Sequence, residues 1–167
     1  MEKMRVHVLA KVEFDGLMVQ NKITDENVEK FDSIFFISLI DTHNKKGPYF
    51  QKDHNNVMNL RFDDVEHDGG TPRVLENDPD LDNFDENRVK AFSEKQANEL
   101  FKFIKSNRDK ATCIVHCMAG ISRSGAVGMF INGYCGGDFE LFKRDNPFVL
   151  PNARVHRMLN AAKYNDY

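Results

Sequence analysis

The segment Ile114–Gly125 constrains the fold more than any other part of the chain. It reads Ile-Val-His-Cys-Met-Ala-Gly-Ile-Ser-Arg-Ser-Gly, and a long apolar run with further glycines follows it up to Tyr134. A short β-branched run bounded by a glycine-containing turn is typical of a buried strand. A stretch that is apolar nearly all round is typical of a buried helix. The segment therefore predicts a strand, a tight loop and a central helix in direct succession.

The other periodic segments indicate which class of fold surrounds this unit. Ser93 and Gln96 form a capping box, and apolar residues follow at helical spacing, so a helix is expected over 94–106. Strands mixed with helices in this order predict an α/β domain with a central, mostly parallel sheet of four to five strands flanked by helices. A chain of 167 residues fits one such domain, covering 1–167. The expected strands are 6–10, 33–40, 57–62 and 112–116, and the other expected helices are 24–31, 125–134, 139–144 and 152–164.

The loop after the central strand has the chemistry of an anion-binding site. Successive backbone N–H groups in such a loop form a nest, and the positive end of the next helix adds to it. Arg123 closes the nest with a guanidinium that matches two phosphate oxygens at once. The same environment favours the thiolate of Cys117, which is a strong nucleophile. The residues expected to bind phosphate are Met118, Ala119, Gly120, Ile121, Ser122 and Arg123.

This segment resembles the signature loop of the protein tyrosine phosphatase superfamily: Cys, five residues, Arg, then Ser or Thr. The stretch from His116 to Ser124 is similar to the form found in dual-specificity phosphatases and their small prokaryotic and viral relatives. The resemblance covers most of residues 33–160. It implies a phosphatase-type P-loop between a strand and a buried helix, and hydrolysis of phosphotyrosine through a cysteinyl-phosphate. It leaves open whether phosphoserine and phosphothreonine are also substrates.

The resemblance also implies a role for each site residue. Cys117 is the nucleophile, Arg123 holds the phosphate, and Ser124 donates a hydrogen bond to the sulfur as it leaves. His116 orients the loop and transfers no proton. The stretch Asn59–Asp64 is similar to the strand and acid loop of the family, and Asp64 falls where the general acid is expected. The implied reaction uses no metal and no cofactor.

Asp63 competes with Asp64 for the role of general acid. In the strand before them Met58, Leu60 and Phe62 alternate on one face, and a period of two carries Asp64 to the same side. We therefore expect Asp64 to reach the substrate and Asp63 to face away.

Residues 63–87 differ in composition from the rest of the chain. They hold ten carboxylates and one arginine, with Gly69, Gly70, Pro72 and Pro79 as breakers. Such a stretch predicts a long solvated loop or lid, with substrate selection as the alternative role. A calcium loop beginning at Asp78 is excluded, because Asn83 and Val89 stand where glycine and glutamate are needed.

Composition limits the partners and the location. The net charge is −3 and no basic stripe is present, so a phosphorylated protein is the expected partner and nucleic acid is not. Two alternatives remain open: a phosphatase acting on RNA 5′-phosphate or another non-protein phosphoester, and a module that binds phosphorylated partners without turnover. The odd cysteine count favours a reducing compartment. With no secretory signal or apolar span in the sequence, a cytoplasmic monomer without membrane contact is expected.

Overall fold

The computed structural model describes residues 2–166 and has a parallel sheet at its centre. The strands are β1 (Arg5–Ala10), β2 (Ile34–Ile40), β3 (Val57–Arg61) and β4 (Thr112–Cys117). Within the described residues they form one four-stranded sheet in the order β1-β4-β2-β3, and every pair is parallel. The predicted α/β class and parallel sheet are therefore confirmed.

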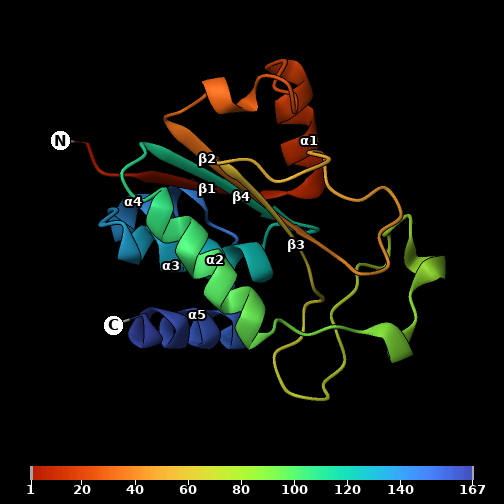
Figure 1. Cartoon of the computed structure of the whole chain (residues 1–167). Coiled ribbons are helices and arrows are strands. Elements are labelled where there is room, and N and C mark those ends of the chain that lie inside the picture. Colours follow the sequence, from red (N-terminus) through yellow and green to blue (C-terminus); the bar gives the residue numbers. More distant parts are fainter. Residues whose placement is uncertain (1, 167) are drawn as a thin grey trace.

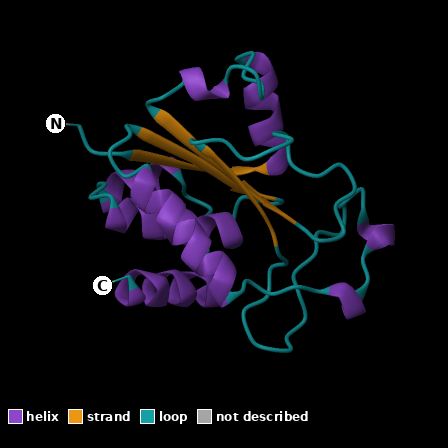
Figure 2. Cartoon of the chain, in the orientation of Figure 1, coloured by secondary structure: helices purple, strands orange, loops and turns teal. Residues whose placement is uncertain are grey.

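Helices cover both faces of the sheet, which makes three layers (Figure 1; Figure 2). The first helix, α1, lies on one face, and the other four lie on the opposite face (Figure 1). Successive residues of β2 contribute to the cores on opposite faces of the sheet, because successive side chains of a strand point to opposite faces. Phe35 and Ile37 join the core under the four helices, whereas Phe36 joins a second core under α1. The helices are α1 (Lys11–Gln20), α2 (Glu94–Ser106), α3 (Arg123–Tyr134), α4 (Phe139–Asp145) and α5 (Ala153–Asn165).

Two sequence predictions differ from the structure in the N-terminal region. The helix expected over 24–31 is absent there, and only a short 3-10 turn, Val28–Lys30, forms. The helix α1, whose N-cap is Ala10 and whose buried residues include Phe14 and Met18, was not predicted from the sequence. Glu13 replaces the missing cap side chain, since its carboxylate accepts the Ala10 N–H at 2.9 Å. The buried residues four positions apart were the signal for this helix.

The segment 63–87 lies beyond the carboxyl ends of the strands (Figure 1). It is irregular apart from the short 3-10 turns Leu81–Asn83 and Glu86–Arg88. An isolated antiparallel bridge joins Asp64 to Arg73 and closes the first part of the segment into a loop. The prediction of a long loop is therefore correct, and this loop stands at the edge of the sheet where β4 ends.

Among residues 2–166, no helix is both long and apolar enough to cross a bilayer.

Candidate active site

The loop between β4 and α3 packs against the junction of β1 and α1. Gly120 has φ +72°, and a Cβ there would lie 2.6 Å from the backbone of both Leu9 and Ala10. The Lys11 N–H donates a hydrogen bond to the Met118 carbonyl at 3.2 Å. A positive φ and so close an approach to backbone both require glycine. This contact therefore fixes the path of the loop directly after Cys117.

Cys117 is the last residue of β4, and its sulfur meets the first turn of α3. The residue is buried, and its Sγ lies 3.0 Å from Ser124 Oγ. Cys117 also lines a cavity of about 360 Å³ at the carboxyl edge of the sheet. A cavity of this size is typical of small-ligand sites.

The other two cysteines have surroundings that keep them protonated. Burial raises the pKa of the Cys113 thiol well above its ordinary value. Burial also raises the pKa of Cys135, to about 11. Both are therefore thiols at neutral pH, and neither lines the cavity beside Cys117.

The guanidinium of Arg123 is buried in the cavity wall and held from two sides. Its Nη1 lies 2.6 Å from Asp41 Oδ1 and donates to the Phe62 carbonyl at 2.7 Å. Burial lowers the pKa of Arg123, but nearby negative charges, Cys117 first, outweigh burial and leave that pKa raised. Arg123 Nε is buried, and no atom of residues 2–166 accepts a hydrogen bond from it. An unpaired buried donor on a cation can serve an anionic ligand.

Asp41 was not predicted from the sequence. It follows β2 directly, so it shares the edge of the sheet at which Cys117 ends β4. Burial raises the pKa of Asp41, although the charge of Arg123 opposes this effect. A polar residue just after a buried strand was the signal for it, because parallel strands bring their carboxyl ends together.

Asp64 lies in the cavity wall, as the alternation along β3 predicts. Its Oδ1 accepts hydrogen bonds from Ser122 Oγ at 2.8 Å and from Asn152 Nδ2 at 2.7 Å. Arg73 Nη1 stands 3.5 Å from its Oδ2. The carboxyl group is therefore attached to the loop after Cys117 through Ser122.

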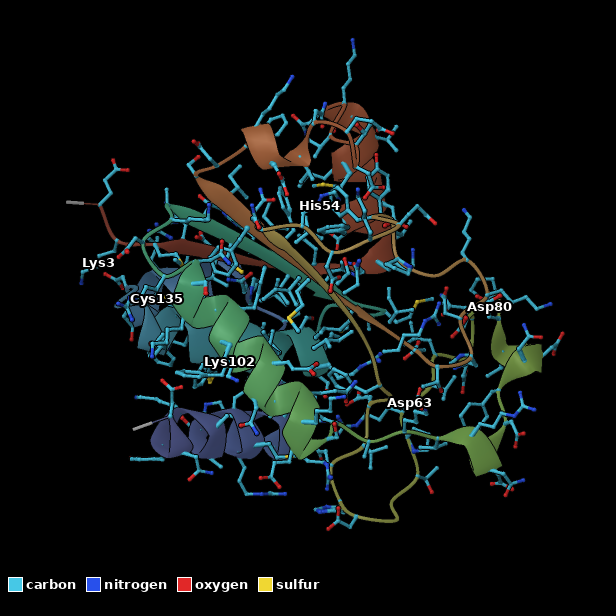
Figure 3. All side chains as sticks on the ribbon, viewed as in Figure 1. Lys3, His54, Asp63, Asp80, Lys102 and Cys135 are labelled. Carbon is cyan, nitrogen blue, oxygen red and sulfur yellow. The ribbon has the colours of Figure 1, made fainter. Side chains whose placement is uncertain are left out.

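Asp63 faces away from this cavity and holds two backbone segments together. Its carboxylate accepts the Thr42 N–H at 3.0 Å, the Thr42 hydroxyl at 2.7 Å and the Lys90 N–H at 2.8 Å. Figure 3 shows Asp63 and Asp80 beyond the carboxyl ends of the strands, far from Cys135 at the opposite edge. Asp63 thus fastens the end of the long acidic segment to the residues after β2.

Two further residues of the site, Asn152 and Arg73, were missed as site residues. Asn152 is the N-cap of α5, and it donates to Asp64 while its N–H donates to the Ser122 carbonyl at 2.9 Å. Arg73 is part of the acidic segment, and it donates to Ser122 Oγ at 2.8 Å and pairs with Glu66 at 2.9 Å. Only tertiary packing brings these residues to the loop, so no local pattern marks them.

His116 is fully buried next to Cys117 and is neutral. Its Nδ1 donates to the Cys117 carbonyl at 3.2 Å, and its ring lies 4.2 Å from the Phe14 ring. Burial lowers the pKa of His116 to about 3. A neutral, enclosed imidazole fits the predicted orienting role better than proton transfer.

The structure thus brings most of the predicted site residues to one cavity. Gly120, His116 and Ser124 stand behind its wall, where they support the loop and the sulfur. The predicted residues that line the cavity are Asp64, Cys117, Met118, Ala119, Ile121, Ser122 and Arg123, and the unpredicted ones are Asp41, Glu66, Arg73, Val74, Leu75, Leu150 and Pro151.

One buried group beside the cavity has a composition that a metal ion could use. Within residues 2–166, ligand atoms of Asp41, His43 and Asp78 lie within 4.8 Å of one another. Each of these side chains already has a protein partner, because His43 Nε2 bonds to Asp78 Oδ2 at 2.8 Å and Asp41 pairs with Arg123. The group fastens Asp78 of the acidic segment to the residues after β2.

Comparison with known proteins gives little further information. No family model matches the chain, and no curated protein sequence matches it. Among solved structures, the chain is similar to the crystal structure of Tk-PTP in the active form, with 14% sequence identity and a TM-score of 0.36. The similarity covers 98% of this chain and 93% of that one. A likeness of this size does not establish a shared family or activity.

Proposed function

We propose that the chain is a cysteine-dependent phosphatase that hydrolyses phosphotyrosine in a phosphorylated protein. The main support is the placement of Cys117 and the buried guanidinium of Arg123 in the wall of one cavity, with Ser124 Oγ 3.0 Å from the sulfur. The unpaired Nε of Arg123 and the N–H groups of the loop would meet the phosphate oxygens.

In the first step the Cys117 thiolate attacks phosphorus and the bond from phosphorus to the tyrosine oxygen breaks. Protonated Asp64 gives its proton to that oxygen, so tyrosine leaves as the neutral phenol. Arg123 and the loop N–H groups stabilise the charge on the three equatorial oxygens throughout. The products of this step are the free tyrosine side chain and a cysteinyl-phosphate.

In the second step water attacks the cysteinyl-phosphate and inorganic phosphate is released. The Asp64 carboxylate takes a proton from the water, which returns the acid to its starting state. The bond from sulfur to phosphorus breaks, and the Ser124 hydroxyl donates a hydrogen bond to the thiolate as it forms. The cycle needs neither a metal ion nor a cofactor, because the protein supplies every charge.

The cavity wall supports an aryl phosphate as the substrate. Val74, Leu75, Leu150 and Pro151 add apolar surface around the polar loop residues. Apolar walls with a few convergent polar groups suit an aromatic ring that carries one charged group. Phosphoserine lacks that ring and would leave these walls uncovered.

The test of this function is the variant Cys117→Ser. We expect hydrolysis of p-nitrophenyl phosphate and of a phosphotyrosyl peptide to fall to background, because serine is not ionised at neutral pH. Binding of vanadate or phosphate should remain, because the loop and Arg123 are unchanged. Cys135→Ser is the matched control and should keep normal turnover. Activity in Cys117→Ser, or no turnover of either substrate by the wild type, would rule the proposal out.

A further inference from the structure

The segment between α4 and α5 has two exposed large apolar side chains, and one of them, Leu150, lines the cavity. Phe148 is 79% exposed and Leu150 is 72% exposed, whereas Val149 between them is half-buried against the core. Leu150 lines the cavity, and its N–H donates to the Ile121 carbonyl at 3.0 Å. This surface is therefore attached directly to the proposed phosphate-binding loop.

The acidic segment lines another part of the cavity. Glu66, Val74 and Leu75 line the cavity, and Leu75 is 38% exposed. We use the term apolar rim for Leu75 and Leu150, which line the cavity, together with Phe148, two residues before Leu150. The apolar rim leaves a large apolar area in water beside a site that, under the proposed function, takes a side chain of another protein. Exposed apolar area at a cavity mouth is typical of a surface that a ligand covers.

The segment 63–87, which lines part of the cavity, is strongly acidic. Residues 63–87 hold ten carboxylates and one arginine, although the whole chain has a net charge of only −3. The arginine of the segment, Arg73, is already paired with Glu66. Glu76, next to Leu75, is exposed, and so are Asp82 and Glu86. Among residues 2–166, no lysine, arginine or histidine forms an ion pair with these three carboxylates. Their negative charge is therefore available to act on an approaching peptide.

We propose that this mouth selects phosphotyrosine flanked by a large apolar residue and by lysine or arginine, and rejects acidic flanks. The inference rests on the proposed function and deepens it by naming the substrate sequence class. Covering the rim with an apolar side chain removes its exposed surface from water. Basic residues of the peptide are attracted to the unpaired carboxylates, and acidic residues of the peptide are repelled by them.

Matched phosphopeptides test the selection directly. Each carries one phosphotyrosine, with leucine on one side and two lysines on the other, in both orders. Companion peptides replace leucine by serine or the lysines by glutamates, and p-nitrophenyl phosphate is the substrate without flanks. At low ionic strength we expect the value of kcat/KM to be at least about tenfold higher with lysine than with glutamate. This ratio should shrink as salt is added, because the charges are exposed.

Two variants assign the preference to the surface. Phe148→Ser should lower the advantage of leucine over serine by at least about threefold. Phe139→Ser, which alters an exposed phenylalanine on α4, is its control and should leave that advantage intact. The triple variant Glu76→Gln, Asp82→Asn, Glu86→Gln should reduce the ratio of lysine to glutamate peptides by at least about threefold. Its control is Glu2→Gln, Asp32→Asn, Asp109→Asn, which removes equal charge before β1, β2 and β4 at the opposite edge.

The outcomes separate this inference from the proposed function. Turnover of all the peptides at equal rates, or a preference for glutamate, would overturn the selection while the phosphatase proposal stands. A lysine preference that the triple variant and its control reduce equally would also overturn it, because the preference would then reflect overall charge. Failure to hydrolyse even p-nitrophenyl phosphate would instead remove the proposed function on which the inference rests.

Discussion

At the scale of single residues, Arg123 is the clearest test of the proposed phosphate site. Lysine keeps the charge but has no planar fork, so it cannot hold Asp41, the Phe62 carbonyl and a phosphoryl group together. We expect Arg123→Lys to lower kcat/KM for p-nitrophenyl phosphate by at least about a hundredfold. Arg88→Lys changes an arginine whose side chain is 86% exposed and should have no effect. Near-normal rates in Arg123→Lys would show that this arginine serves the fold alone.

Asp64 and Asp63 are adjacent in the sequence but have different surroundings. In Asp64→Asn the amide oxygen still accepts from Ser122 and Asn152, so the local structure should survive without the acidic proton. We expect turnover of phosphotyrosyl peptide to fall by a factor of roughly 10² to 10⁴. The loss should be smaller for aryl phosphates with acidic phenols, because those leave without a proton. Equal losses across a series of phenols would contradict the role of Asp64 as the acid.

Asp63→Asn should reduce stability instead of turnover. In the variant, the amide nitrogen of the new asparagine would face the backbone N–H of Thr42 or of Lys90. In the wild type each of these N–H groups donates to a carboxylate oxygen of Asp63. Losing such a buried hydrogen bond costs about 1–3 kcal/mol. We expect the free energy of unfolding in urea to fall by that amount, while turnover per folded molecule stays close to normal. A large loss of turnover with unchanged stability would mean that the two aspartates exchange roles.

At the scale of elements, Gly120 tests how the contact with β1 shapes the loop. In Gly120→Ala the new Cβ meets the backbone of Leu9 and Ala10 at 2.6 Å, so the loop or the start of α1 must move. Gly136→Ala is a matched control, since Gly136 also has φ +72° but no atom lies within 4 Å of its added Cβ. Both should lose roughly 1 kcal/mol of stability from the positive φ. Only Gly120→Ala should also lose phosphatase activity, measured as kcat/KM, and equal activity in the two variants would contradict this role of the loop contact.

The elements also show which parts of the fold could be predicted from the sequence. The β4–loop–α3 unit was predictable because its apolar runs and its glycine are contiguous. The helix α1 was missed because Ala10 is no recognisable cap and its buried stripe is short. The expected helix over 24–31 was wrong, since acidic residues after Thr24 favour a helix start but do not supply a buried face. Local patterns therefore predicted elements that have both a boundary signal and a continuous apolar face.

The site was predictable to the same extent and for the same reason. Cys117, Arg123 and Ser124 fall within eight residues, and Asp64 follows from the alternation of side chains along β3. Asp41 and Asn152 reach the loop only because the sheet order and the packing of α5 bring them there. The spacing of these residues along the chain does not predict such contacts. Their positions, after a strand and at a helix start, become informative once the topology is known.

At the scale of the whole molecule, buried His116 should make stability depend on pH. Its pKa is about 3 in the folded protein against 6.5 for an ordinary histidine, because burial disfavours the charged ring. Between these values the unfolded chain binds a proton that the folded chain does not. The contribution of His116 is therefore fully present above pH 6.5 and is lost as pH falls toward 3.

The variant His116→Asn should flatten this dependence. One proton corresponds to about 1.4 kcal/mol per pH unit, so the free energy of unfolding should fall less steeply from pH 6.5 to 4.5 in the variant than in the wild type. Asp41, whose pKa is raised by burial, acts in the opposite direction, but it is common to both proteins and cancels in the comparison. The control His67→Asn alters an exposed histidine and should keep the wild-type slope. Urea unfolding at several pH values measures these slopes. Equal slopes in the wild type and His116→Asn would mean that the ring takes up its proton as readily in the folded protein as in the unfolded chain, and the assignment of a neutral His116 would be wrong.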